Sequence, residues 1–310
     1  MAPLSYETIY WIDLPICILS AIVNFLIFVA YIYFRDLRIY NFRLVFYLAI
    51  SELLTCTGKK YLAFMLPWWQ SYEMCIAQAI ILNFSGLSSI LWTSVISFTI
   101  YRSVVLEKKD GWKYEMYYLL YAFGIPLSMN FLPMLTNSFG EAEGWCWITI
   151  EGGSFIRTFL GGNLWRIINY IAPLWLIIFF NFVMYLRTLA KIRRMIDNVT
   201  DEDLRKNMLY NRLKLYPLML LICHLPVTVH RVLGFFDIVD PDNVWLTSLL
   251  ASFFIILSGF LNAVVYGLTD RVKQELQKLM LATSSDSSED ISFITSSEGD
   301  ENGRGSTYTI

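Results

Sequence analysis

The chain consists mainly of long apolar runs separated by short polar stretches. Seven of these runs are long enough to cross a bilayer, which takes about 20 mostly apolar residues at about 1.5 Å rise each. Segments of this length in lipid must satisfy their own backbone hydrogen bonds, so we expect helices. The predicted spans are residues 9–34, 42–66, 75–101, 114–135, 163–187, 212–236 and 244–268.

The composition agrees with a membrane protein. The chain is 56% hydrophobic and 16% charged, whereas soluble domains carry about 45–50% apolar and about 25% charged residues. We therefore expect an all-α membrane protein built as a seven-transmembrane helix bundle.

Lysine and arginine are distributed unequally between the two sides of this bundle. The loops after spans one, three, five and seven, together with the tail, hold 19 of the 24 basic residues. Basic residues mark the cytosolic side, so the N-terminus is expected outside and the C-terminus inside. The basic residues on the outer side are Lys59, Lys60, Arg157, Arg166 and Arg231.

The region after the last span divides into two parts. Residues 270–280 are amphipathic and predict a short helix on the membrane surface, which would complete a receptor domain over residues 1–280. Residues 281–310 are rich in Ser, Thr and acids, a composition typical of disordered tails. Phosphorylation there by a kinase would suit a basic, arrestin-like partner; the alternative is an unmodified tail. The candidate sites are Ser284, Ser285, Ser287 and Ser288.

Several seven-helix classes are disfavoured by missing residue types. A retinal Schiff base needs a lysine in the last span, and residues 244–268 have none. The two histidines, His224 and His230, are six apart on one helix and do not share a face, so no metal site is expected. We expect no cofactor, no enzymatic activity and no nucleic-acid partner.

The stretch 144–148, GWCWI, places a cysteine between two tryptophans in the second outer loop. Cys146 in this loop and Cys75 at the outer end of the third span would both face an oxidising compartment, where disulfides persist. They form the natural pair, and the alternative is two free thiols. Trp145 and Trp147 fit the aromatic belt at the membrane surface.

A disulfide at this place is a feature of G-protein-coupled receptors, and three stretches sharpen the resemblance. GWCWI is similar to the loop of the slime-mould cyclic-AMP receptors and their cyclic-AMP-receptor-like relatives, the class E-type group. Residues 215–232 (LYPLMLLICHLPVTVHRV) and 259–267 (GFLNAVVYG) look like that group's sixth and seventh helices. The resemblance covers most of residues 10–270.

The resemblance implies a polar switch inside the bundle. Residues 48–52, LAISE, resemble the LAxxD pattern of rhodopsin-like receptors, with Glu52 in place of Asp; Asn24 and Asn262 would lie near it, and Tyr266 ends the seventh-helix pattern. A carboxylate within the membrane is a functional candidate; the alternative is a packing role.

Pro226 should kink the sixth helix, which makes it a candidate hinge for an outward movement of that helix; the alternative is a static kink. His224 replaces the Trp that both patterns usually carry after the Cys. It is therefore either a switch residue or a satisfied core histidine.

Ligand and G-protein contacts are expected at opposite ends. Cationic side chains in the outer half would suit a small anionic ligand such as a cyclic nucleotide. The alternatives are snorkelling to lipid headgroups and pairing with loop acids. The outer candidates are Lys59, Lys60, Arg166, His230 and Arg231.

At the inner end, Arg102 only loosely resembles the conserved arginine of rhodopsin-like receptors, because no acid precedes Tyr101. Arg102 and Arg194 are nonetheless candidate contacts for a heterotrimeric G protein. The alternatives are an arginine that snorkels to anchor the helix end, for Arg102, and ordinary positive-inside charge, for Arg194. The sequence thus favours a plasma-membrane receptor of the cyclic-AMP-receptor-like type. There are two alternatives. One is a transporter or channel with a polar path through Glu52, and the other is a receptor-like scaffold that has lost signalling.

Overall fold

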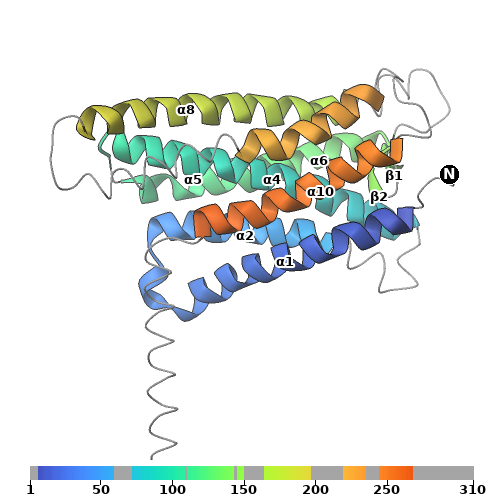
Figure 1. The fold of residues 1–310 in the computed structure, drawn as a ribbon, viewed down its shortest axis with the longest axis horizontal. Helices are drawn as coiled ribbons and strands as arrows, with labels where there is room; N and C mark the ends of the chain where they lie inside the picture. Colours follow the sequence, from blue (N-terminus) through green and yellow to red (C-terminus); the bar gives the residue numbers. More distant parts are fainter. Residues whose placement is uncertain are drawn as a thin grey trace, which may run out of the picture. The chain divides into compact units, whose positions relative to one another are not determined.

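The computed structural model describes residues 6–58, 72–108, 110–142, 145–149, 164–196, 219–234 and 244–267. In these ranges the chain is helical apart from connections and one two-stranded hairpin. The long helices run roughly along one another (Figure 1). They are α1 (Tyr6–Tyr33), α2 (Tyr40–Cys56), α4 (Tyr72–Val104), α8 (Ala172–Ile196), Met219–Gly234 and α10 (Val244–Asn262). Helices α5 (Glu115–Leu119) and α6 (Ile125–Leu135) are shorter.

Short helical turns join or extend these helices. Three of them have wide, π-helical turns that continue the neighbouring α-helix without a break. The short elements are η1 (Arg35–Leu37), η4 (Gly111–Tyr114), η5 (Leu120–Gly124), α7 (Leu164–Arg166), η7 (Ile167–Ile171) and η8 (Ala263–Gly267).

Five segments of the described chain are long and apolar enough to cross a membrane. They are Trp11–Tyr33, Tyr72–Val104, Gly111–Leu135, Leu164–Arg194 and Leu246–Val265. Each lies on a span expected from the sequence. Two shorter helices, α2 with 17 residues and Met219–Gly234, fall inside the expected spans 42–66 and 212–236. The rest of those two spans lies outside the described residues, as do the expected surface helix 270–280 and the tail.

Two helices are longer than the apolar pattern indicates. Helix α4 continues to Val104, and α8 runs to Ile196 where the expected span ends at 187. The added turns of α8 carry Arg193 and Arg194 at the helix C-terminus, where positive charge interacts favourably with the helix dipole. Hydrophobicity detects only the part of a helix that lies in the membrane, whereas the helix itself can continue beyond the membrane surface.

Helix α4 lies between the other elements. It packs against α2, α6, α8 and both hairpin strands. Its buried face includes many small hydroxyl residues, which let helices approach closely. One such contact joins α4 to α8: Ser97 Oγ donates to Asn181 Oδ1 at 2.5 Å, and Asn181 Nδ2 donates to Thr93 Oγ1 at 3.2 Å.

The π-helical turns of the fourth and fifth spans each precede a proline. Pro126 follows η5, and Pro173 follows η7. Proline lacks an N–H and its ring clashes with the carbonyl four residues earlier, so the preceding turn widens. The same rule accounts for the widened turn before Pro173. In η7 it carries Asn169 and Tyr170.

Candidate functional site: an outer cavity above a polar hub

A hairpin closes one end of the bundle, an element that an all-α expectation leaves out. Strands β1 (Phe139–Ala142) and β2 (Trp145–Ile148) are antiparallel, with Glu141 opposite Cys146. Cys146 is joined to Cys75 by a disulfide with a Cα–Cα distance of 5.2 Å, which confirms the predicted pair. The bond ties β2 to the beginning of α4.

Trp147 points from β2 into the bundle. It is buried, and its Nε1 donates to Asn83 Oδ1 of α4 at 3.3 Å. The expectation that Trp147 belongs to an aromatic belt at the membrane surface is wrong. Residues alternate sides along a strand, so the disulfide at Cys146 helps to fix which way its neighbour Trp147 faces.

Two buried arginines contact the Trp147 indole. Arg231 Cζ lies 4.9 Å from the ring centre and Arg166 Cζ lies 5.6 Å from it. Arg166 Nε also donates to the Ile148 carbonyl at 2.8 Å. Tyr170 packs edge-on against the same indole, with centroids 5.8 Å apart. Five elements, β2, α4, α7, η7 and the helix Met219–Gly234, thus meet at one aromatic ring.

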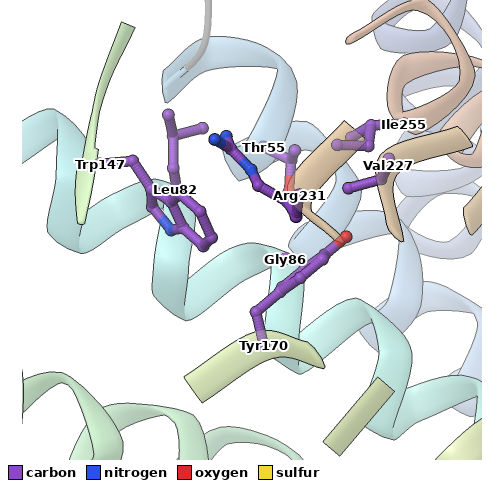
Figure 2. Close-up of a pocket in the computed structure, with 8 residues that line it drawn as sticks. All are labelled: Thr55, Leu82, Gly86, Trp147, Tyr170, Val227, Arg231 and Ile255. Carbon is purple, nitrogen blue, oxygen red and sulfur yellow. The ribbon is translucent and has the colours of Figure 1, made fainter. Parts of the chain in front are cut away.

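Below Trp147 lies a cavity of about 60 Å³. Figure 2 shows Arg231 extending across it towards Trp147 and Leu82, with Tyr170 approaching from another side. The volume holds a few water molecules and is far below the roughly 300–1,000 Å³ typical of ligand pockets. Its lining residues are Thr55, Leu82, Gly86, Trp147, Tyr170, Val227, Arg231 and Ile255.

Gly86 leaves room in the cavity wall. A Cβ added there would meet no described heavy atom within 4 Å. The space therefore depends on the absence of a side chain on α4, and a larger residue at 86 would occupy it.

The residues expected to bind a ligand lie in different places in the structure. Arg166 and Arg231 come together at Trp147. His230 is buried and its Nδ1 lies 2.9 Å from Thr247 Oγ1 of α10, so it links two helices. Lys59 and Lys60 lie outside the described residues.

A polar hub lies deeper in the bundle. Glu52 of α2 accepts hydrogen bonds on Oε1 from Ser89 Oγ at 2.5 Å and from Asn262 Nδ2 at 2.8 Å. Asn24 Nδ2 donates to the carbonyls of Ser20 at 2.9 Å and Gly259 at 3.3 Å. The expected proximity of Asn262 to Glu52 is confirmed. Asn24 instead bonds to the Gly259 carbonyl, and the side chain of Tyr266 lies outside the described part.

The cavity stands directly above this hub. Residues three or four apart on a helix share a face. On four helices, a residue that lines the cavity lies at this spacing from a residue at the level of the hub. The pairs are Thr55 with Glu52, Gly86 with Ser89, Ile255 with Gly259, and Val227 with His224.

His224 has an unusual position on this lower level. It is buried, and its Nδ1 has no hydrogen-bond partner among the described residues. The helix continues through Pro226 two residues later. His224, Val227 and Arg231 lie at spacings of three and four along the helix Met219–Gly234 and so share one face. His224 therefore places a polar atom on the helix face that carries Arg231.

At the opposite end of α4, Arg102 has an acid partner that the sequence did not reveal. Its Nη2 donates to Asp110 Oδ1 at 2.6 Å, and its Cζ lies 4.3 Å from the ring centre of Tyr114. The acid stands eight residues after Arg102 rather than two before it. Arg194 is exposed on the last turn of α8, and candidate phosphorylation sites lie outside the described residues.

The sequence missed several further contributors. Trp147 and Tyr170 were not recognised as cavity residues, because nothing in a linear pattern gives the direction of a loop tryptophan or of a π-helical tyrosine. Asp13 of α1, fully buried, accepts a hydrogen bond from Ser252 of α10. An acid inside an apolar run could have signalled that contact.

Comparison with known proteins agrees with this architecture. Residues 4–274 match the family described as slime mold cyclic AMP receptor. The chain is 31% identical over 271 residues to G-protein coupled receptor 1 of Arabidopsis thaliana, covering 84% of this chain and 78% of that protein.

Two further relatives are more distant. Cyclic AMP receptor-like protein A of Dictyostelium discoideum is 27% identical over 250 residues, covering 79% of this chain and 60% of that protein. G-protein coupled receptor 157 of Homo sapiens is 28% identical over 169 residues, covering 50% of this chain and 48% of that protein.

Proposed function

This chain belongs to the slime mold cyclic AMP receptor family, whose members are multi-pass membrane receptors rather than enzymes. From this premise we propose that the protein binds a small extracellular anion and activates a heterotrimeric G protein. The arrangement of Arg166 and Arg231 around Trp147 carries this proposal. Arg231 lines the cavity, and Arg166 contacts the same indole. Two buried guanidinium groups at one indole suit a phosphate or carboxylate.

The proposal includes a seven-helix bundle in the plasma membrane with its N-terminus outside. The distribution of Lys and Arg supports this orientation. The disulfide and hairpin supply a second argument, because disulfides persist on the oxidising side. The cavity below Trp147 would then open to the outside.

Ligand entry would require movement of Arg231. The cavity of about 60 Å³ is too small for a nucleotide-sized anion, and Arg231 lies across it. An anion that draws Arg231 away from Trp147 would have different affinities for two conformations of the receptor. These conformations would differ in the position of the helix Met219–Gly234. Differential affinity of this kind shifts a conformational equilibrium, with Pro226 as the hinge and outward movement of helix six as the result.

The inner end would then receive the G protein. Arg102, held by Asp110 and Tyr114, and the exposed Arg194 are the proposed contacts. Phosphorylation of Ser284, Ser285, Ser287 and Ser288 would add negative charge for an arrestin-like partner.

Nucleotide exchange on added heterotrimers, with the purified receptor in nanodiscs, tests the proposal. Cyclic AMP, inorganic phosphate and citrate are the probes. Removing a charged hydrogen bond costs about 1.5–3 kcal/mol, so Arg231→Gln should raise the half-maximal concentration of the active probe about 10- to 100-fold. Arg35→Gln, at an exposed position of η1, is the charge-matched control.

A second pair of variants tests the cavity itself. Gly86→Leu should abolish the response by filling the space, whereas Gly234→Leu should not, although neither glycine has a described heavy atom near its Cβ. Exchange that no probe stimulates with several heterotrimers would contradict coupling. An ion flux that requires Glu52 would instead favour the transporter or channel.

A further inference from the structure

A second and much larger hollow lies between three helices on the inner side of the bundle. It measures about 590 Å³, within the range of small-molecule pockets. Its walls come from α4, from the continuous helix α5–η5, and from α8. No residue of this groove belongs to the Trp147 cavity or to the Glu52 hub.

The groove faces lipid. Leu176 on α8 is 70% exposed and Tyr117 on α5 is 69% exposed, and both belong to segments long and apolar enough to cross a membrane. Ser94 lies eight residues before Arg102 on α4, about 12 Å at 1.5 Å per residue. The groove is therefore within the hydrocarbon layer of about 30 Å, and its occupant is a membrane component.

The chemistry of the walls restricts that component. The nine described lining residues include five aromatic side chains and none that is charged, so the walls do not fit an ionic headgroup. Hydroxyl groups are present: Ser94 Oγ donates to the Leu91 carbonyl at 2.7 Å and lies 3.1 Å from Tyr121 OH. Tyr121 therefore donates to Ser94, and both oxygens can still accept a hydrogen bond. Flat aromatic walls with hydroxyls suit a rigid, flat, uncharged lipid that carries one hydroxyl.

A short sequence pattern points the same way. Lys113, Tyr117 and Leu119 follow the spacing of a basic residue, an aromatic residue and a branched aliphatic residue, the reverse form of a weak sterol-contact motif. Tyr117 of this pattern and its neighbour Tyr118 both line the groove.

We propose that the groove between α4, α5–η5 and α8 is a sterol-binding site. The ring system lies against the aromatic walls, and the hydroxyl meets the tyrosine and serine hydroxyls. This site is independent of the extracellular ligand and of the G protein.

Photolabelling of the full-length protein in nanodiscs tests the site. A photoreactive cholesterol analogue should label peptides from α4, α5–η5 and α8 saturably. Unlabelled cholesterol should compete, and phosphatidylcholine should not. Leu176→Trp, which narrows the exposed rim, and Val95→Phe, which fills the buried wall, should each reduce labelling at least about fivefold, in line with the roughly 1 kcal/mol cost of a misfitted apolar contact.

Leu186→Trp is the matched control. It places the same indole at another exposed position of α8, about two turns beyond the groove, and should leave labelling unchanged. Labelling that does not saturate, that phosphatidylcholine displaces, or that persists in both groove variants would overturn the proposal. Because the assay needs neither ligand nor heterotrimer, its outcome is separate from that of the exchange assay.

Discussion

Gly259 of α10 lies directly against the Glu52 carboxylate of α2. A Cβ at position 259 would stand 2.6 Å from Glu52 Oε2 and 2.9 Å from Ser20 Oγ. Backbone therefore meets carboxylate here, and this close approach lets Asn262, one turn further along α10, reach Oε1 of the same acid. The glycine is a requirement of the hub rather than a helix breaker.

Gly259→Ala should consequently destabilise the protein. Alanine favours a helix interior over glycine by about 1 kcal/mol, but the added methyl overpacks the hub, at a typical cost of about 1–3 kcal/mol. We expect a lower thermal midpoint in nanodiscs. Gly86→Ala has open space at its Cβ among the described residues and should leave the midpoint unchanged or raise it. Equal shifts in the two variants would contradict the close contact.

The disulfide gives a second prediction, for stability without any ligand. Cys75 and Cys146 are separated by 71 residues in sequence, and a bridge of this kind typically contributes about 2–4 kcal/mol, in large part by restricting the unfolded chain. Cys75→Ser and Cys146→Ser should each lower the thermal midpoint by the same amount, and the double variant by no more.

The control for the disulfide is Cys223→Ser. Cys223 is buried and free, so its loss should not remove the sensitivity of the midpoint to a reducing agent. The two bridge variants should lose that sensitivity. Additive effects of Cys75→Ser and Cys146→Ser would contradict a shared bond.

How much of this could be predicted from sequence depends on the range of the interaction. Apolar runs located the described helices, because twenty apolar residues have few alternatives in lipid. The pairing of Cys75 with Cys146 followed from topology alone. The approach of Asn262 to Glu52 came from a family pattern rather than from periodicity.

The remainder depended on directions that a linear pattern does not encode. The turn of Trp147 into the bundle follows from the register of β2 with β1, and hairpin strands of four residues give too short an alternation to detect. Asp110 was missed as the partner of Arg102 because the acid was sought before the arginine, on the same helix. In the structure it lies beyond the end of α4, where the chain turns back.

Asp110 supports a prediction about acid titration. The hydrogen bond from Arg102 holds the pKa of the Asp110 carboxyl below its ordinary value of 3.8. Stability that comes from this bond is therefore fully present above pH 3.8 and is lost as the pH falls through the lowered pKa. In carbon-13 NMR the carboxyl of Asp110 should titrate below 3.8, and Arg102→Gln should raise the midpoint towards 3.8.

Lys191→Gln provides the comparison for that titration. It removes the neighbouring ion pair with Glu107, whose atoms are 3.1 Å apart, while the bond between Arg102 and Asp110 stays. The Asp110 midpoint should not move in this variant. A midpoint that rises equally in both variants would show a general loss of positive charge rather than a specific bond.

The contact between Arg231 and Trp147 should be measurable as a coupling energy before any ligand is known. A guanidinium over an indole contributes about 0.5–1 kcal/mol when exposed and about 2 kcal/mol when desolvated, and both side chains are buried. A double-mutant cycle of Arg231→Met and Trp147→Leu on unfolding free energy should give a coupling of this size. A control cycle combines Arg231→Met with Tyr47→Phe and should give no coupling energy. The Tyr47 hydroxyl donates to Glu115 at 2.9 Å in the inner half of the bundle. Additivity of the first pair would mean that Trp147 does not hold Arg231, and the proposed link from anion to helix movement would lose its starting contact.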